Sequence, residues 1–210
     1  MLKIDNIFVL SFLSLILSSC CELGIPAGAC CGDDKIGELL LSDTELSYIP
    51  YTSFNNTFYT SQNGSEVFAS IQNFDRDLYK LSFDDHSCDY HTYERKSGRV
   101  YFFSIDLAFD ITLDTYPHAN MTILAKSLDE IDNAYHTVEE TSLKPDCSKF
   151  YNDSFELLTQ DTLVFGFQFH NAMVFENCDN SQVLDKLILS PDLGIDMIIF
   201  NDSTFLKLNN

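Results

Sequence analysis

The stretch Phe103-Ser-Ile-Asp-Leu-Ala-Phe-Asp-Ile-Thr-Leu-Asp114 decides the fold class of this chain. Every odd-numbered position in it is apolar, and the even-numbered positions carry Asp, Ser or Thr apart from Ala108. Because successive side chains of a β-strand point to opposite faces, this period of two predicts a strand with one buried and one solvated face. Residues 163–169 repeat the pattern, with Leu or Phe at each odd position. We therefore expect a mainly β protein.

Turn residues divide the other apolar runs into hairpins. Asn63-Gly64 lies between two such runs, and both residues accept the positive φ of a tight hairpin turn. Ser97-Gly98 is interpreted in the same way. Near the C-terminus, the apolar runs 187–189, 195–200 and 205–208 are separated by short segments rich in Pro, Gly, Asn and Asp. These patterns predict an antiparallel meander sheet that forms a sandwich or a partial barrel.

One helix is expected beside the strands. Ser127-Leu-Asp-Glu130 has the spacing of a capping box, in which the first and last side chains satisfy backbone N–H groups at a helix start. Apolar residues then recur at helical spacing: Leu124, Leu128, Ile131, Tyr135 and Val138. The sequence thus predicts a helix over residues 128–140, packed on the sheet and ending before Pro145.

Composition bounds the class of protein and its partners. The 210 residues are 45% hydrophobic and include 18 Phe and 10 Tyr, which is enough for a real core and too aromatic for a disordered acidic chain. The 12 Lys+Arg stand against 32 Asp+Glu, a net charge of −20. Nucleic acid is therefore excluded as a partner, because phosphate binding requires Lys and Arg to displace counterions.

The N-terminal sequence predicts an export signal followed by a lipid anchor. The apolar run 7–17 is too short to cross about 30 Å of hydrocarbon as a helix, but it has the length of a signal-peptide core. Directly behind it, Leu17-Ser18-Ser19-Cys20 resembles the lipobox of bacterial lipoproteins. The resemblance implies that Cys20 receives a diacylglycerol thioether, that cleavage precedes it, and that its new amine is acylated, with palmitate among the fatty acids expected. Ordinary secretion with cleavage nearby is the alternative.

The resemblance implies an order of segments and a place in the cell. Residues 1–19 are the signal peptide, 20–35 the lipidated cysteine with a Gly- and Pro-containing flexible spacer, and 36–210 a single β-rich domain. Residues 150–157 and 190–195 are similar to the closing strands of uncharacterised exported envelope lipoproteins. We expect a cell-envelope protein held to a bacterial membrane, the outer membrane rather than the inner, with its domain in the periplasm or at the cell surface.

Six cysteines remain if Cys20 carries lipid, and disulfides persist in exported proteins. Cys88, Cys147 and Cys178 fall within the predicted domain, so a disulfide between two of them is expected. The segment Asp84-Asp-His86-Ser-Cys88-Asp-Tyr-His91 also offers candidate metal ligands at His86, Cys88 and His91. A metal would need further ligands, such as His118, His136 or His170. The disulfide is the preferred interpretation of Cys88, and no metal or cofactor is expected.

Candidate catalytic residues are lacking. Asp106, Asp110 and Asp114 are spaced about 13 Å apart along a strand, too far for a shared cation or an acid–base pair, and are expected to form a solvated face. The common nucleophile and phosphate-loop motifs do not occur. We therefore expect a binding or structural module without catalytic residues. An envelope hydrolase with Asp and His from separate strands is one alternative, and a carrier whose aromatics line an apolar cavity is another.

Overall fold

A computed structural model describes residues 34–52, 55–82, 89–116, 119–131, 134–145, 147, 158–179 and 183–209. The chain divides into two compact units, a smaller one of residues 1–39 and 79–93 and a larger one of residues 40–78 and 94–210. The predicted signal peptide, Cys20 and the spacer up to residue 33 lie outside the described residues. Among the described residues, no helix has the length and apolar character needed to span a bilayer.

The described residues form one sheet of twelve strands. Their bounds in chain order are β1 (Asp34–Leu39), β2 (Asn55–Ser61), β3 (Glu66–Ser82), β4 (Asp89–Phe102), β5 (Leu107–Asp114), β6 (Asn120–Ile131), β7 (Ala134–Lys144), β8 (Thr159–Val164), β9 (Phe167–Asn177), β10 (Leu184–Ser190), β11 (Gly194–Phe200) and β12 (Phe205–Leu208). Short helical segments are α2 (Asp43–Ser47) and the 3₁₀ turn η2 (Phe103–Ile105).

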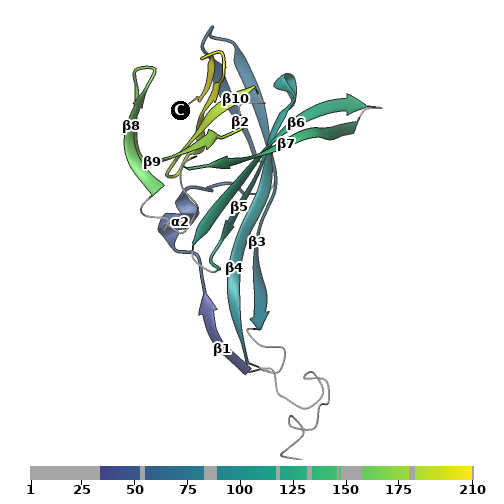
Figure 1. Ribbon diagram of the computed structural model, residues 1–210, viewed down its shortest axis with the longest axis vertical. Helices are drawn as coiled ribbons and strands as arrows, with labels where there is room; N and C mark the ends of the chain where they lie inside the picture. Colours follow the sequence, from purple (N-terminus) through teal and green to yellow (C-terminus); the bar gives the residue numbers. More distant parts are fainter. Residues whose placement is uncertain are drawn as a thin grey trace, which may run out of the picture. The chain divides into compact units, whose positions relative to one another are not determined.

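Ten of these strands close into an antiparallel barrel (Figure 1). Around it the order is β4-β3-β2-β12-β11-β10-β9-β7-β6-β5, and β5 closes the ring on β4 with pairs from Phe102↔Leu107 to Arg95↔Asp114. β8 pairs with β9 outside this ring. The prediction of a mainly β protein with a curled antiparallel sheet is therefore confirmed.

The larger unit is organised around the alternation that the sequence shows. On β5, Phe109, Ile111 and Leu113 are fully buried, whereas the residues that alternate with them, Asp110, Thr112 and Asp114, are partly exposed. Side chains from the barrel strands join them in one apolar cluster, whose largest fully buried members include Tyr59, Phe102 and Phe175. At about 25 cal/mol per Å² of apolar area removed from water, this cluster is the main source of stability.

The segment that leads into β2 contributes to the same core. α2 begins with a capping box in which the Ser42 side chain accepts a hydrogen bond from the Glu45 N–H and the Glu45 carboxylate accepts one from the Ser42 N–H. On either side of this short helix lie buried residues that belong to the main cluster: Leu41, Tyr48, Ile49 and Tyr51. The capping box and these buried neighbours stabilise a helix too short to be stable alone.

In the smaller unit, β1 pairs with β4 in parallel from Asp34↔Asp89 to Leu39↔Tyr93. Two aromatic contacts accompany this pairing. The rings of Tyr79 and Tyr93 stack with centroids 5.3 Å apart, and Lys80 Nζ lies 4.3 Å above the Tyr90 ring.

The predicted helix over residues 128–140 is wrong. These residues belong to β6 and β7, which pair as a hairpin from Ile123↔Leu143 to Ile131↔Ala134. The helical spacing gave no common buried face, since Leu128 is buried while Val138 is 62% exposed. β6 also pairs with β5 along its first eight residues, so sheet hydrogen bonds outweigh the local helical signal.

The predicted turn at Ser97-Gly98 is also wrong, because β4 continues through both residues. Gly98 serves a close approach instead. A Cβ at this position would lie 2.4 Å from Cγ of Phe74 and 2.8 Å from its Cα. Glycine in the middle of this strand therefore makes room for a buried aromatic ring.

Two predicted strands begin or end elsewhere than expected. Residues 163–169 do not form one strand, because the chain reverses at Phe165-Gly166, both with positive φ. Residues 103–105 form η2, and Asp106 takes a left-handed conformation before β5 begins at Leu107. The hairpin at Asn63-Gly64 is confirmed as the β2–β3 connection, and the C-terminal meander is confirmed as β10–β11–β12.

Candidate functional site

A groove lies where the β8–β9 hairpin packs against the outer face of the β10–β11–β12 meander. The hairpin turns at Phe165-Gly166, whose φ values of 50° and 85° fit a two-residue turn with both central residues left-handed. β9 bends at Asn171, which has φ 50° and whose N–H donates to the Asp161 carboxylate at 3.0 Å. The bend lets residues 167–170 leave the barrel wall.

A second apolar cluster fixes the hairpin in place. Phe165 and Phe167 contact the ring of Phe205 on β12, with centroids 5.0 and 5.8 Å away. The buried members of this cluster are Phe169, Ala172, Ile188, Met197 and Ile199. A strained left-handed Phe is uncommon, and here its ring gains a stacking partner that offsets the strain.

The hollow between hairpin and meander has a volume of about 500 Å³. Its lining includes Phe167, Phe169, Pro191 and Leu193 as apolar surface. Ser190, Asp196 and Lys207 contribute polar atoms, and Gln168 and His170 stand on the hairpin side. We call this site the hairpin groove.

The polar part of the hairpin groove is a largely buried ion pair between Lys207 and Asp196. Lys207 Nζ bonds Asp196 Oδ1, and Ser190 Oγ donates to Asp196 Oδ2 at 2.7 Å. The side chain of Asp196 is 5% exposed and that of Lys207 17% exposed. The ammonium also lies 5.6 Å from the centroid of the Phe169 ring. Both carboxylate oxygens are thus held in place, so the pair presents fixed dipoles without net charge.

Two buried tyrosines hold the strand that carries Asp196. The Ile195 N–H donates to the Tyr51 hydroxyl at 2.5 Å, and the Tyr59 hydroxyl donates to the Ile195 carbonyl at 2.7 Å. Burial raises the pKa of both hydroxyls well above the ordinary value, so both remain protonated. β11 therefore has a rigid position at the residue before Asp196.

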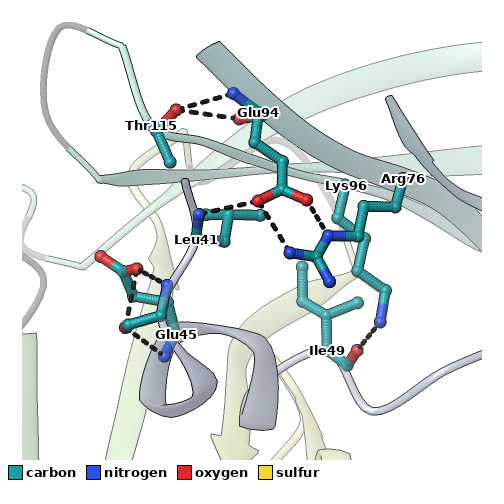
Figure 2. A network of polar contacts seen from close by, with 8 residues as sticks. Leu41, Glu45, Ile49, Arg76, Glu94, Lys96 and Thr115 are labelled. Atoms are coloured by element: carbon teal, nitrogen blue, oxygen red, sulfur yellow. Dashed lines mark hydrogen bonds and ion pairs between the residues drawn. The ribbon is translucent and has the colours of Figure 1, made fainter. Parts of the chain in front are cut away.

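A second polar cluster lies around Glu94 (Figure 2). Its carboxylate accepts hydrogen bonds from the Leu41 N–H and from Arg76 Nη2, each at 2.9 Å. The backbone of Glu94 exchanges hydrogen bonds with Thr115. Nearby, Lys96 Nζ donates to the Ile49 carbonyl, and burial, followed by the charge of Arg76, lowers the pKa of Lys96. These bonds fasten the Leu41–Ile49 segment to the barrel wall.

Of the three aspartates predicted to form a solvated face, Asp110 and Asp114 form ion pairs on β5, whereas Asp106 precedes that strand. Asp114 receives two bonds from Arg95, and Asp110 pairs with both Arg99 and Lys126. Lys126 also reaches Glu140 at 2.8 Å, which joins four strands in one ladder. Burial would raise the pKa of Asp110, but hydrogen bonds from Arg99 and Lys126 outweigh it and hold that pKa below the ordinary 3.8.

The structure brings together two of the three candidate disulfide cysteines. Cys147 and Cys178 are bonded, with Cα atoms 5.3 Å apart. Cys88 and the metal candidate His86 lie outside the described residues. His91 is on β4, where its Nδ1 would be 2.5 Å from a Cβ at Gly37. Within the described ranges, no group of three or more His, Cys, Asp or Glu is placed to hold a metal ion.

The hydrolase alternative needs a nucleophile within reach of a histidine and a carboxylate. His170 Nδ1 lies 3.4 Å from Asp161 Oδ2 at the hairpin surface, where both side chains are more than half exposed. The hydroxyl of Ser190 in the same groove donates to Asp196. Ser190 therefore uses its proton in a bond to a carboxylate rather than to the histidine base that a triad pairs with its nucleophile.

The sequence interpretation missed the residues of the hairpin groove. One signal was present, since Asp196 interrupts the apolar run Ile195–Phe200 and a charged residue in a buried strand is informative. Its partners Ser190 and Lys207 come from the neighbouring strands and share no sequence pattern with it. Comparison with protein-family models, with curated proteins and with solved structures found no match for this chain.

Proposed function

We propose that this chain is a lipid-anchored protein of the bacterial cell envelope and that its acidic β-barrel serves there as a binding or structural module. The lipobox-like Leu17-Ser18-Ser19-Cys20 behind the apolar run 7–17 is the observation that carries the proposal. The Cys147–Cys178 disulfide supports it, because disulfides form and persist in exported proteins.

The anchor follows from the chemistry of acyl chains. Each buried methylene contributes about 0.8 kcal/mol, so one chain binds a bilayer marginally and two or three bind durably. Lipid on Cys20 would leave residues 21–33 as a tether ahead of β1. Removal of residues 1–19, which contain Lys3 and Asp5, keeps the net charge at −20, so the acidity belongs to the exported part.

Three features of the larger unit support a module rather than a hydrolase or an internal carrier. The strands of the barrel share one contiguous apolar cluster, which buries aromatic rings such as Tyr59, Phe102 and Phe109 as core. The surface pair His170–Asp161 makes no catalytic arrangement with Ser190. The hairpin groove instead offers a preformed hollow with an apolar and a polar part, as ligand sites do.

The test is to identify the modification at Cys20 in the native membrane protein. Mass spectrometry of the N-terminal peptide should find a diacylglycerol thioether and an acylated amine. Cys20→Ala should leave an unprocessed chain that loses lipid, whereas the matched variant Cys21→Ala should retain processing and detergent-phase partitioning. An unmodified Cys20 thiol, or unchanged partitioning of Cys20→Ala, overturns the proposal.

A further inference from the structure

We infer that the hairpin groove binds a neutral saccharide. The inference rests on the binding half of the proposed function and is independent of the lipid anchor. It starts from the pairing, within one hollow of about 500 Å³, of an aromatic wall with a buried ion pair. Preformed small-molecule sites commonly have volumes of about 300–1,000 Å³ and combine apolar surface with a few fixed polar groups.

The apolar part of the groove fits the face of a sugar ring. Phe167 is 39% exposed, and its ring is held edge-on against Phe205 at 76° between planes. Pro191 and Leu193 follow β10 in the turn at the end of the groove. A pyranose ring presents C–H groups on its faces and hydroxyls around its rim, so an aromatic wall and a polar floor match its two kinds of surface.

The polar part fits hydroxyls in particular. An ammonium has three N–H donors, and Asp196 takes one from Lys207. The carboxylate and the Ser190 hydroxyl are held by each other and by Lys207, so they do not need to reorganise when a ligand arrives. Charge-assisted hydrogen bonds from such fixed groups are stronger than those between neutral partners. Vicinal hydroxyls, which both donate and accept, can use this arrangement.

Charge decides between neutral and acidic sugars. Asp196 and Lys207 cancel, so the floor offers no excess positive charge. The chain as a whole carries a net charge of −20, and a field of that sign lowers the local concentration of anions. His170, the ionisable residue of the groove lining besides Asp196 and Lys207, lies 3.4 Å from Asp161 at the surface. A neutral saccharide is therefore favoured over a uronate.

The inference is tested by calorimetric titration of the full chain in an amine-oxide detergent, which carries no sugar headgroup. The probes are chitotriose and maltotriose as neutral saccharides, trigalacturonate as the acidic one and trialanine as a peptide. We expect at least one neutral probe to bind with a Kd of about 1 mM or tighter. At low salt, trigalacturonate should bind at least about ten-fold more weakly than the neutral probe that binds. This difference in affinity should decrease at higher salt, because salt screens the negative field of the protein.

Variants locate the binding. Phe167→Ala should weaken it about ten-fold, whereas the matched Leu163→Ala, on the same hairpin but outside the groove lining, should leave it unchanged. The double variant Asp196→Asn with Lys207→Met removes both charges together and should also weaken it about ten-fold or more. Thermal unfolding of each variant establishes that it is folded.

The inference is overturned if neither neutral probe binds at about 10 mM, if trigalacturonate or trialanine binds more tightly than both, or if folded groove variants bind as wild type does. Detergent-phase partitioning of the same preparations reports the anchor separately. Loss of sugar binding with intact lipid therefore contradicts this inference alone, and loss of lipid with intact sugar binding contradicts the anchor alone.

Discussion

The Tyr51 hydroxyl accepts a hydrogen bond from the Ile195 N–H, across 144 positions of sequence. Gly194, the residue before Ile195, has a φ of 73°, and a Cβ there would lie 2.3 Å from the Tyr51 oxygen. The buried tyrosine and the start of β11 therefore exclude any side chain at position 194. This contact connects the segment after α2 to the strand that carries the floor of the hairpin groove.

Gly194→Ala should lower the free energy of unfolding by about 2–5 kcal/mol, measured by urea denaturation. A left-handed alanine costs about 1–2 kcal/mol, and overpacking against Tyr51 adds about 1–3 kcal/mol. Gly166→Ala is the matched control, because Gly166 has a φ of 85° and nothing within 4 Å of its Cβ position. Equal losses in the two variants would contradict the role of Tyr51.

Glu94→Gln should lower the free energy of unfolding by about 1–3 kcal/mol, because it removes the charge from hydrogen bonds that Leu41 and Arg76 donate. The Glu94 side chain is 3% exposed, so water cannot replace these partners. Glu38→Gln, which breaks an exposed pair with Lys35, should change stability by no more than about 0.5 kcal/mol. A loss at Glu94 as small as that at Glu38 would show that the cluster does not fasten the segment.

The ion-pair ladder predicts a specific pH dependence. The pKa of Asp110 is lower in the folded state than its ordinary value of 3.8, so its ion pairs stabilise the fold fully above that value. Their contribution is lost as the pH falls through the depressed folded pKa. The stability difference between wild type and Asp110→Asn should therefore be constant near neutral pH and shrink below about pH 4. Urea unfolding at a series of pH values measures this difference.

Asp106→Asn is the control for the acid series, since Asn accepts the left-handed conformation that Asp106 adopts. At neutral pH its stability should stay close to that of wild type. If the stability difference between wild type and Asp110→Asn persists unchanged at the lowest pH, protonation of Asp110 does not remove the stabilisation, and the ion pairs are not its source.

Local patterns predicted the strand class and the C-terminal meander because a period of two and turn residues act over a few positions. They could not predict which strands meet. Two segments carry the same S-x-x-E signature, yet Ser42–Glu45 caps α2 whereas Ser127–Glu130 lies in a strand. The difference is tertiary, since β6 is paired with β5 on one side and β7 on the other.

The candidate site was harder to predict for the same reason. Ser190, Asp196 and Lys207 meet because neighbouring strands of the meander align them, and Phe167 joins them through a hairpin turn with a left-handed Phe. A sequence shows the anomaly of a buried aspartate but not its partners. Likewise, Gly98 is compatible with a turn and with a close approach, and the position of Phe74 decides between them.

Removal of the Cys147–Cys178 disulfide should lower the free energy of unfolding, because the unfolded chain then gains conformational entropy. The two cysteines are 31 positions apart, and closing a loop of that length in the unfolded chain corresponds to about 3–4 kcal/mol. Replacing both by Ala should reduce the free energy of unfolding by that amount in urea denaturation. Either single variant should lose as much as the double variant, because each breaks the same bond. Losses that add in the double variant would indicate instead that the two thiols stabilise the barrel by separate contacts.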